Sequence, residues 1–191
     1  MALGICVGGV SGWTGSAVAR GVLDEPDLEL SGAVARKVKG EDAGQVVGRT
    51  GIGLAVADSV DAALERGGID VYVDYTHPSA VKANVIAALN RGVPAIVGTS
   101  GLGAADYAEI AKVAEARGLG VVASGNFSIT AALLQHFALI AARHVPEFEI
   151  IDYAKSTKPD APSGTANELA ERLQEVREPK IDLPQDQVAG R

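Results

Sequence analysis

A glycine-rich turn between an apolar run and a helical stretch constrains the fold of this chain more than any other feature. The run Leu3–Val7 is long enough for a buried strand. The glycines that follow it are spaced as GxxGxxG, at Gly9, Gly12 and Gly15, and a helical stretch continues through Val22. In such a unit one glycine permits the turn, another lets the backbone approach a pyrophosphate, and the third lets helix and strand pack closely. A purely structural glycine loop is the alternative.

Strands and helices continue to alternate along the chain. We expect further strands at 28–34, 54–57, 71–75, 95–97 and 119–123, each followed by a loop or helix. This pattern predicts an α/β fold, a Rossmann-like doubly wound parallel sheet covered on both faces, over residues 1–127. An amphipathic helix at 128–143, a strand at 148–153 and a helix at 167–178 predict a smaller α+β second domain over 128–191.

The end of the second expected strand discriminates between the nicotinamide dinucleotides. An acidic residue about 20 positions beyond the glycines would hydrogen-bond the adenosine ribose of NAD. Ala35 stands there instead, followed by Arg36, Lys37 and Lys39. A guanidinium grips a phosphate with two parallel hydrogen bonds, so Arg36 and Lys37 favour NADPH, with NADH still possible. Solvated loop charges are the alternative.

Three other strand ends carry small or amide-bearing residues. They are Asp74–Pro78, Gly98–Gly101 and Ser124–Phe127. Ligands bind where parallel strands finish, so we expect these segments to share an edge with the glycine turn. Tyr75 and Phe127 offer flat apolar surfaces for a nicotinamide ring, and glycine beside threonine allows close approach to its carboxamide.

Residues 158–166, Lys-Pro-Asp-Ala-Pro-Ser-Gly-Thr-Ala, predict a second site. A lysine and a proline-stiffened loop lead into Ser163, Gly164 and Thr165 at the start of a helix. Helix-start amides lack intrahelical partners and the macrodipole favours negative charge there, so hydroxyls and an ammonium complete an anion pocket. A plain loop with a Ser or Thr N-cap is the alternative.

Composition narrows the class of partner. The formal net charge of −7 argues against nucleic acid and anionic membranes as partners, because both require a basic surface. The single cysteine, Cys6, permits no intramolecular disulfide. We find no signal peptide and no membrane-spanning run, and so expect a cytoplasmic protein. No metal site is predicted.

Five motifs, in this order, resemble the dihydrodipicolinate reductase (4-hydroxy-tetrahydrodipicolinate reductase) family of lysine biosynthesis. They are the GxxGxxG loop, Asp-Tyr-Thr-His-Pro, Gly-Thr-Ser-Gly, Asn-Phe-Ser and the 158–166 motif. The resemblance runs along essentially the whole chain. It implies a Rossmann domain and a substrate domain in a homo-oligomer, usually a tetramer. It also implies NADH- or NADPH-dependent reduction of a cyclic unsaturated imine dicarboxylate.

The resemblance and the residue patterns together define the predicted site. Lys158 is implied as the catalytic lysine. The substrate is expected to contact Lys155, Ser163, Gly164 and Thr165. The dinucleotide is expected to contact Gly9, Val10, Ser11, Gly12, Trp13, Thr14, Gly15, Arg36, Lys37, Tyr75, Thr76, Gly98, Thr99, Ser100, Ser124, Gly125, Asn126 and Phe127.

The chain departs from the family pattern in its proton-delivering motif. Where the family has Glu-x-His-His-x-x-Lys, residues 152–158 read Asp-Tyr-Ala-Lys-Ser-Thr-Lys. Ala154 stands in place of the family's proposed proton donor, and Lys155 in place of a substrate-contacting histidine. A positioned acid contributes about 10²–10⁴-fold to the rate, and alanine cannot supply one. Lys158, Lys155, Tyr153 or water could substitute.

The family also continues past Arg191 with more of the substrate domain's sheet, so we expect a chain that is incomplete at its C-terminus. Two alternatives to the family's reaction remain open. The first is an imine reductase acting on a different cyclic or secondary imine. The second is a catalytically impaired protein that binds NADPH.

Overall fold

The structure is a computed structural model that describes residues 2–153 and 162–180. It divides into two compact units, Met1–Ser124 and Gly125–Arg191. Every strand assigned in the described ranges belongs to the first unit. None of the helices in these ranges has the length and apolar character needed to cross a membrane.

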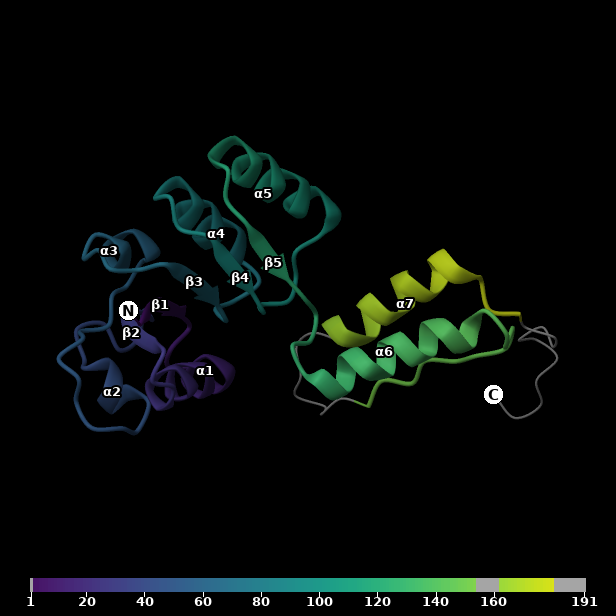
Figure 1. Ribbon diagram of the computed structural model, residues 1–191, viewed down its shortest axis with the longest axis horizontal. Coiled ribbons are helices and arrows are strands. Elements are labelled where there is room, and N and C mark those ends of the chain that lie inside the picture. The colour runs from purple at the N-terminus through teal and green to yellow at the C-terminus, as the bar shows by residue number, and fades with distance from the viewer. Residues whose placement is uncertain (1, 154–161, 181–191) are drawn as a thin grey trace. The chain divides into compact units, whose positions relative to one another are not determined.

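Five parallel strands form the sheet of the first unit, in the order β2-β1-β3-β4-β5 (Figure 1). They are β1 (Leu3–Gly8), β2 (Leu28–Val34), β3 (Val71–Asp74), β4 (Ala95–Val97) and β5 (Val121–Ala123). The helices of this unit are α1 (Trp13–Asp24), α2 (Ala43–Val46), α3 (Val60–Leu64), α4 (Val81–Asn90) and α5 (Ala104–Arg117). The predicted Rossmann-like parallel sheet is confirmed.

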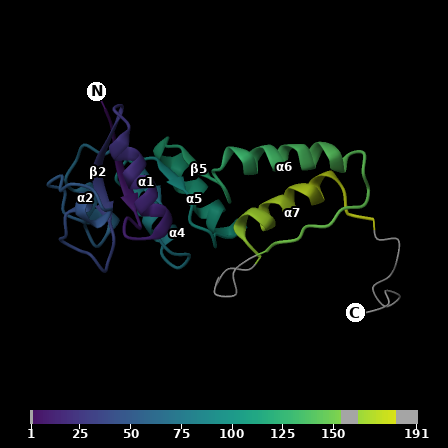
Figure 2. The same cartoon turned by 90° about the horizontal axis from the view of Figure 1, so that it is seen from below.

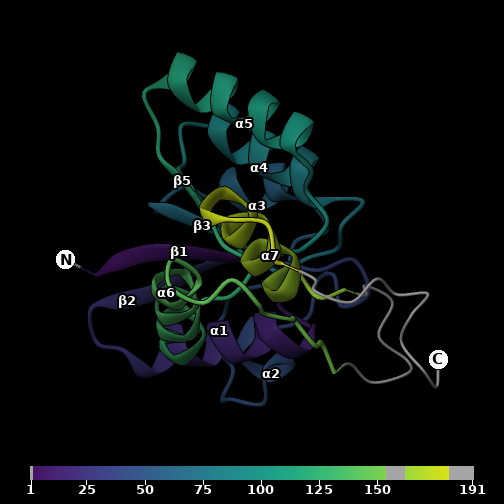
Figure 3. The ribbon, with the colours of Figure 1, turned by 90° about the vertical axis from the view of Figure 1, so that its right-hand side faces the viewer.

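Helices cover both faces of this sheet, and Figure 3 shows α1 on one side with α4 and α5 on the other. Successive side chains of a strand point to opposite faces, so each central strand feeds two cores. Cys6 and Tyr72 belong to the core under α3, α4 and α5. Val7 and Val73 belong to the core under α1. Burial on both faces explains why these strands are continuous apolar runs in the sequence.

The segment 54–57, predicted as a strand, forms only isolated bridges. Ala57 pairs with Val34 in parallel and lies beside β2, whereas Ala55 pairs with Asp42 in the antiparallel sense. Its backbone hydrogen bonds are thus shared between two neighbours, and neither pairing continues into a ladder. The prediction of a regular strand is wrong. The segment nevertheless occupies the position of the outer third strand in the 3-2-1-4-5-6 order of dinucleotide-binding sheets.

The described part of the second unit consists of two helices, α6 (Ile129–Ala142) and α7 (Gly164–Val176), that lie side by side (Figures 1 and 2). Arg172 of α7 donates a hydrogen bond of 3.1 Å to the buried Gln135 of α6. The strand predicted at 148–153 is not formed. Among the described residues of this unit there is no strand with which its backbone could pair.

Helix α6 matches the predicted 128–143 span within one residue at each end. Its apolar side chains are not confined to a buried face, because Leu134 and Phe137 are both more than half exposed. Helix α7 begins three residues earlier than predicted, since Ser163 rather than a later residue is its N-cap.

Candidate functional site

The glycine turn joins β1 to α1 through very close backbone contacts. Gly9 has φ = +79°, in the left-handed region that favours glycine, and a Cβ there would lie 2.1 Å from the carbonyl oxygen of Tyr75. A Cβ on Gly15 would lie 2.1 Å from the carbonyl oxygen of Gly9. Gly9 therefore permits the turn, and Gly15 lets the first turn of α1 pack directly on the end of β1.

Helix α1 starts without a side-chain cap. Its N-cap residue is Gly12, whose own N–H donates to the carbonyl oxygen of Gly9 at 2.8 Å. The amides of a helix's first turn have no intrahelical acceptor, and they carry the positive end of the helix dipole. No acidic residue occupies this first turn. The start of α1 is therefore suited to an anion.

A cavity of about 440 Å³ lies beside this helix start. Seven residues of the predicted cofactor set line it, namely Gly9, Ser11, Gly12, Arg36, Lys37, Tyr75 and Thr76. The sequence patterns did not single out the other lining residues, Val34, Ala35, Asp58, His77, Ala80 and Asn84, as contacts. The cavity lies between the carboxyl ends of β1, β2 and β3, where the strand order changes direction, as expected for a ligand site in an open α/β sheet.

Asp58 brings a negative charge to the basic side of this cavity. Lys39 Nζ lies 2.5 Å from Asp58 Oδ2. The hydrogen bond from Lys39 lowers the pKa of the Asp58 carboxyl below its usual value, so the group is ionised at neutral pH. Asp58 follows the 54–57 segment, and the strand-end rule applied to that segment could have found it.

Asp74, at the end of β3, is fully buried and accepts hydrogen bonds from five donors. The Tyr72 hydroxyl (2.6 Å) and the Asn84 amide (3.1 Å) donate to Oδ2. The Thr76 backbone N–H (3.0 Å), the Thr76 hydroxyl (2.8 Å) and the Thr99 hydroxyl (2.6 Å) donate to Oδ1. This one carboxylate therefore joins the ends of β3 and β4 to helix α4.

Gly8 makes room for part of this cluster. It pairs with Asp74 in the sheet, and a Cβ on it would lie 2.2 Å from the Tyr72 hydroxyl oxygen. Burial, reinforced by the negative charge of Asp74, raises the pKa of Tyr72 above its ordinary value, so the phenol remains a donor. Nearby, the ring of Tyr75 covers Gly98, where a Cβ would lie 2.2 Å from the ring carbons.

The remaining predicted contacts of the first unit differ in exposure. The side chain of Val10 is buried in the α1 core, whereas Trp13 is 86% exposed at the start of α1. Thr14 is exposed and Ser100 is half-buried. The Ser124 N–H bonds to the carbonyl oxygen of Val97 at 3.3 Å. These residues do not line the 440 Å³ cavity.

The second unit brings two predicted segments together at the start of α7. Asn126, from the predicted cofactor set, donates from Nδ2 to the Thr165 hydroxyl at 3.0 Å. Thr165 donates to the carbonyl oxygen of Gly125 at 3.3 Å. A Cβ on Gly125 would lie 2.8 Å from the carbonyl oxygen of Gly164, so only glycine allows this contact. Phe127 is 46% exposed beside them in the chain.

Ser163 caps α7 with its own side chain. Its hydroxyl accepts from the Ala166 N–H at 3.2 Å, and its N–H donates to Asp152 Oδ2 at 2.7 Å. Lys155, Lys158 and the Ala154 substitution lie outside the described residues. In the parts of the chain that the structure describes, no group of three or more His, Cys, Asp or Glu side chains could hold a metal ion.

Comparisons with known proteins give a consistent result. A model described as dihydrodipicolinate reductase, N-terminus, matches residues 3–127, and one described as dihydrodipicolinate reductase, C-terminus, matches residues 130–189. The chain is 36% identical over 178 residues to the 4-hydroxy-tetrahydrodipicolinate reductase of Desulfitobacterium hafniense, covering 93% of this chain and 67% of that protein. It is 36% identical over 189 residues to the protein of the same name from Syntrophomonas wolfei, covering 97% and 71%.

Solved structures agree with these matches. Dipicolinate-bound dihydrodipicolinate reductase from Paenisporosarcina sp. TG-14 has a TM-score of 0.79 at 27% identity, covering 100% of this chain and 72% of that one. GenD2 from gentamicin A biosynthesis, solved in complex with NAD, has a TM-score of 0.68 at 20% identity, covering 92% and 54%. The second likeness is one of fold alone.

Proposed function

The chain belongs to the dihydrodipicolinate reductase family of NAD(P)H-dependent oxidoreductases in lysine and diaminopimelate biosynthesis, and on that basis we propose how its residues share the reaction. Residues 1–127 bind the dinucleotide and residues 128–191 bind the substrate, a division supported by the bounds of the two family models. The dinucleotide, when bound, supplies a hydride. The uncapped start of α1, beside a cavity that also contains Arg36 and Lys37, carries this proposal.

The backbone from Gly9 to Gly15 holds the pyrophosphate. The close contacts at Gly9 and Gly15 leave no room for a side chain at those two positions, and the amides of α1 supply donors. The nicotinamide end of the dinucleotide is assigned to Tyr75, Thr76 and the 98–100 and 124–127 segments. Tyr75 and Thr76 line the cavity, which supports this assignment.

Arg36 and Lys37 select NADPH over NADH by pairing with its 2′-phosphate. A hydrogen bond to a charged group is worth about 1.5–3 kcal/mol, so Arg36→Ala should weaken NADPH binding by about 10–100-fold. NADH, which has no such phosphate, should bind the variant about as well as the parent. Isothermal titration with both dinucleotides measures this, and equal losses would remove the argument for a 2′-phosphate site.

A substrate carboxylate binds at the start of α7. The backbone amides of Gly164 and Thr165 donate to this carboxylate, while Ser163 fixes the helix start by capping it. Dipicolinate, bound in the Paenisporosarcina protein, is a planar dicarboxylate of the class that such a site would take. Lys155 and Lys158 also bind the substrate.

Lys158 supplies the proton that accompanies hydride addition, because Ala154 cannot. Lys158→Ala should lower kcat by about 10²-fold or more. Lys158→Arg is the matched control, since a guanidinium keeps the charge but does not release a proton. A kcat restored by arginine would assign Lys158 to binding alone, and unchanged turnover in Lys158→Ala would remove it from the site.

The replacement of the histidine pair favours a second candidate, reduction of a different cyclic imine. Side-by-side kcat/KM values for 4-hydroxy-tetrahydrodipicolinate and simple cyclic imines, with NADPH as reductant, separate the two. A higher value for the simple imines would favour the second candidate. NADPH binding without turnover of any imine would instead indicate a nucleotide-binding protein that has lost catalysis.

We also propose a cytoplasmic homo-oligomer, a tetramer by analogy with its family. The exposed apolar side chains of α6, among them Leu134 and Phe137, support association. The single thiol of Cys6, with no partner for an intramolecular disulfide in the sequence, suits a reducing compartment. Sedimentation equilibrium of the purified chain tests the oligomeric state.

A further inference from the structure

Asp74 stands out among the buried groups because the reaction does not use it directly. In the described ranges, only Asp74 and Gln135 are buried polar or charged residues, and Asp74 is fully buried. A buried carboxylate is costly unless its lone pairs are satisfied, and here five donors converge on the two oxygens. Such a cluster needs an explanation beyond packing, because an apolar side chain would fill the same space without that cost.

The polarity of the cluster has a chemical consequence. A carboxylate only accepts hydrogen bonds, so the hydroxyls of Thr76 and Thr99 must both donate to Asp74 Oδ1, at 2.8 and 2.6 Å. Each hydroxyl then has acceptor lone pairs left over. Asn84 uses one of those on Thr76, at 3.1 Å. The cluster therefore presents acceptors, not donors, at the ends of β3 and β4.

We propose that Asp74 is a positioning residue that turns the hydroxyls of Thr76 and Thr99 into acceptors for the amino group of the nicotinamide carboxamide. This inference rests on the proposed cofactor site. Asp74 does not touch the cofactor; it fixes the direction of two hydroxyls and the relative placement of the two loops that carry them. The chemical class recognised is a primary carboxamide on a flat ring, whose N–H₂ requires acceptors.

The test compares two ligands that differ at the nicotinamide end. Asp74→Asn keeps the shape but replaces one acceptor oxygen by an amide group that donates, so the five-donor arrangement that orients the two threonine hydroxyls cannot be kept. NADPH binding should weaken by about tenfold or more. Adenosine 2′,5′-bisphosphate, which lacks the nicotinamide half, should bind within about twofold of the parent. Titration calorimetry on the full chain measures both without any turnover.

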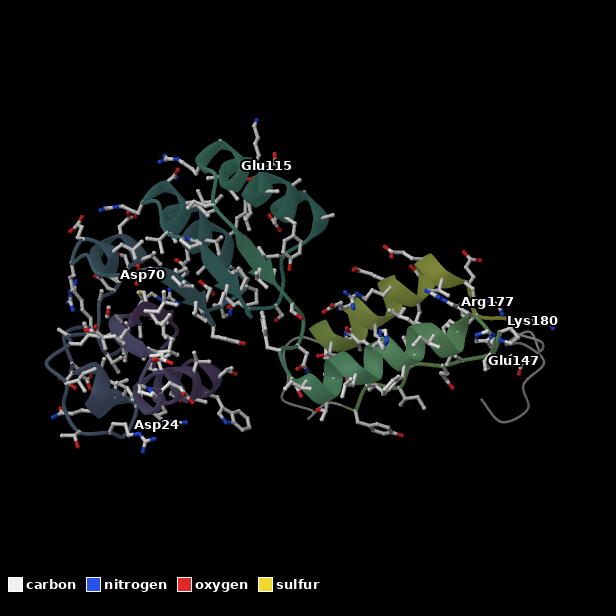
Figure 4. The ribbon with its side chains drawn as sticks, in the orientation of Figure 1. Asp24, Asp70, Glu115, Glu147, Arg177 and Lys180 are labelled. Carbon is white, nitrogen blue, oxygen red and sulfur yellow. The ribbon has the colours of Figure 1, made fainter. Side chains whose placement is uncertain are left out.

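Asp70→Asn is the matched control. Asp70, labelled in Figure 4, precedes β3 at the opposite end of the strand, where its Oδ2 accepts from the Gly4 N–H at 2.8 Å. The same substitution there removes a charge from the same sheet without touching the threonines. Both ligands should bind Asp70→Asn as they bind the parent.

A second pair of variants keeps the test decisive if Asp74→Asn does not fold. Thr99→Val removes the hydroxyl at nearly constant volume, and Thr99→Ser restores it. Selective loss of NADPH affinity in the valine variant, recovered by serine, supports the proposal. Equal losses for both ligands, or no loss for either, would overturn it. A parent chain that binds neither ligand would instead show that the proposed cofactor site itself is wrong, and this inference with it.

Discussion

The two helix starts assigned to anions differ in how their first turn is occupied. At α1 the N-cap is Gly12, which offers no side chain. At α7 the N-cap is Ser163, whose hydroxyl already accepts from Ala166, while the Asp152 carboxylate accepts from the Ser163 N–H. The α1 start thus has no side-chain cap, whereas the α7 start is capped by the protein's own serine.

This difference indicates that the α1 start mainly provides affinity for its ligand, whereas the α7 start mainly positions its ligand. An uncapped, positively polarised helix start gains the most from a strongly charged ligand such as a pyrophosphate. A self-capped start with a carboxylate close by gains less from a substrate carboxylate, and it holds its shape when the substrate leaves. We therefore expect tight dinucleotide binding at α1 and weaker, more exchangeable carboxylate binding at α7.

Gly15→Ala should have the largest effect, because it disrupts the packing of α1 on β1 that forms the proposed dinucleotide site. The added Cβ would lie 2.1 Å from the Gly9 carbonyl oxygen, so α1 must move away from β1. We expect no detectable NADPH binding and a free energy of unfolding lower by about 1–3 kcal/mol. Gly21→Ala is the control, since Gly21 is on the same helix with nothing within 4 Å of its Cβ position. Urea titration and calorimetry of both variants give the comparison.

Gly12→Asp should convert the α1 start into one that resembles α7. The aspartate would cap the helix and place a negative charge where the pyrophosphate binds, so NADPH affinity should fall by about 100-fold. Gly12→Ser caps without the charge and should lose less. If both variants bound NADPH as tightly as the parent, the pyrophosphate would not lie at this helix start.

Ser163→Ala makes the opposite change at α7. Loss of an N-cap side chain costs about 1 kcal/mol, so the unfolding free energy should fall by that amount. The KM for the imine substrate should rise several-fold while the affinity for NADPH is unchanged. Ser163→Gly should recover most of the stability, because glycine is a tolerated N-cap. A rise in the NADPH dissociation constant in Ser163→Ala would contradict the separate roles.

Asp152→Asn should have the smallest effect. It keeps an acceptor for the Ser163 N–H and removes one negative charge next to the substrate carboxylate. The affinity for dipicolinate should rise by about threefold, as expected for one partly screened surface charge. Competition against the imine substrate measures it. A fall in affinity would mean that Asp152 orders the helix start more than it repels the ligand.

The strands show what could be predicted from sequence and why. The predicted bounds 28–34 and 95–97 match those of β2 and β4 to the residue. Residues 95–97 are all apolar, as expected of a parallel strand covered on both faces, whereas 28–34 includes the exposed Glu29. The segment 54–57 is equally apolar, but it shares its hydrogen bonds between two neighbours. The segment 148–153 has no strand to pair with among the described residues of the second unit. Strand pairing depends on segments that are distant in the sequence, so a local pattern cannot predict it.

The site shows the same limit. The glycine turn is contiguous in the chain, so its spacing predicts it. Asp74 and Asn84 were missed because their importance arises from contacts between the β3 end, the β4 end and α4. His77, which also lines the cavity, lies inside the Asp-Tyr-Thr-His-Pro motif, and a single histidine in a turn indicates no role by itself. Donors from separate parts of the chain converge on the Asp74 carboxylate, and no periodic pattern in the sequence indicates that they do.

The reactivity of the Cys6 thiol reports how often the first unit opens. Cys6 is the only cysteine in the sequence, it lies on the interior strand β1 with no exposed surface, and burial raises its thiol pKa to about 12. A thiol reagent can therefore reach a reactive thiolate only when the first unit opens. Its labelling rate measures the frequency of that opening in the unmodified chain, and NADPH should slow the labelling in proportion to its occupancy.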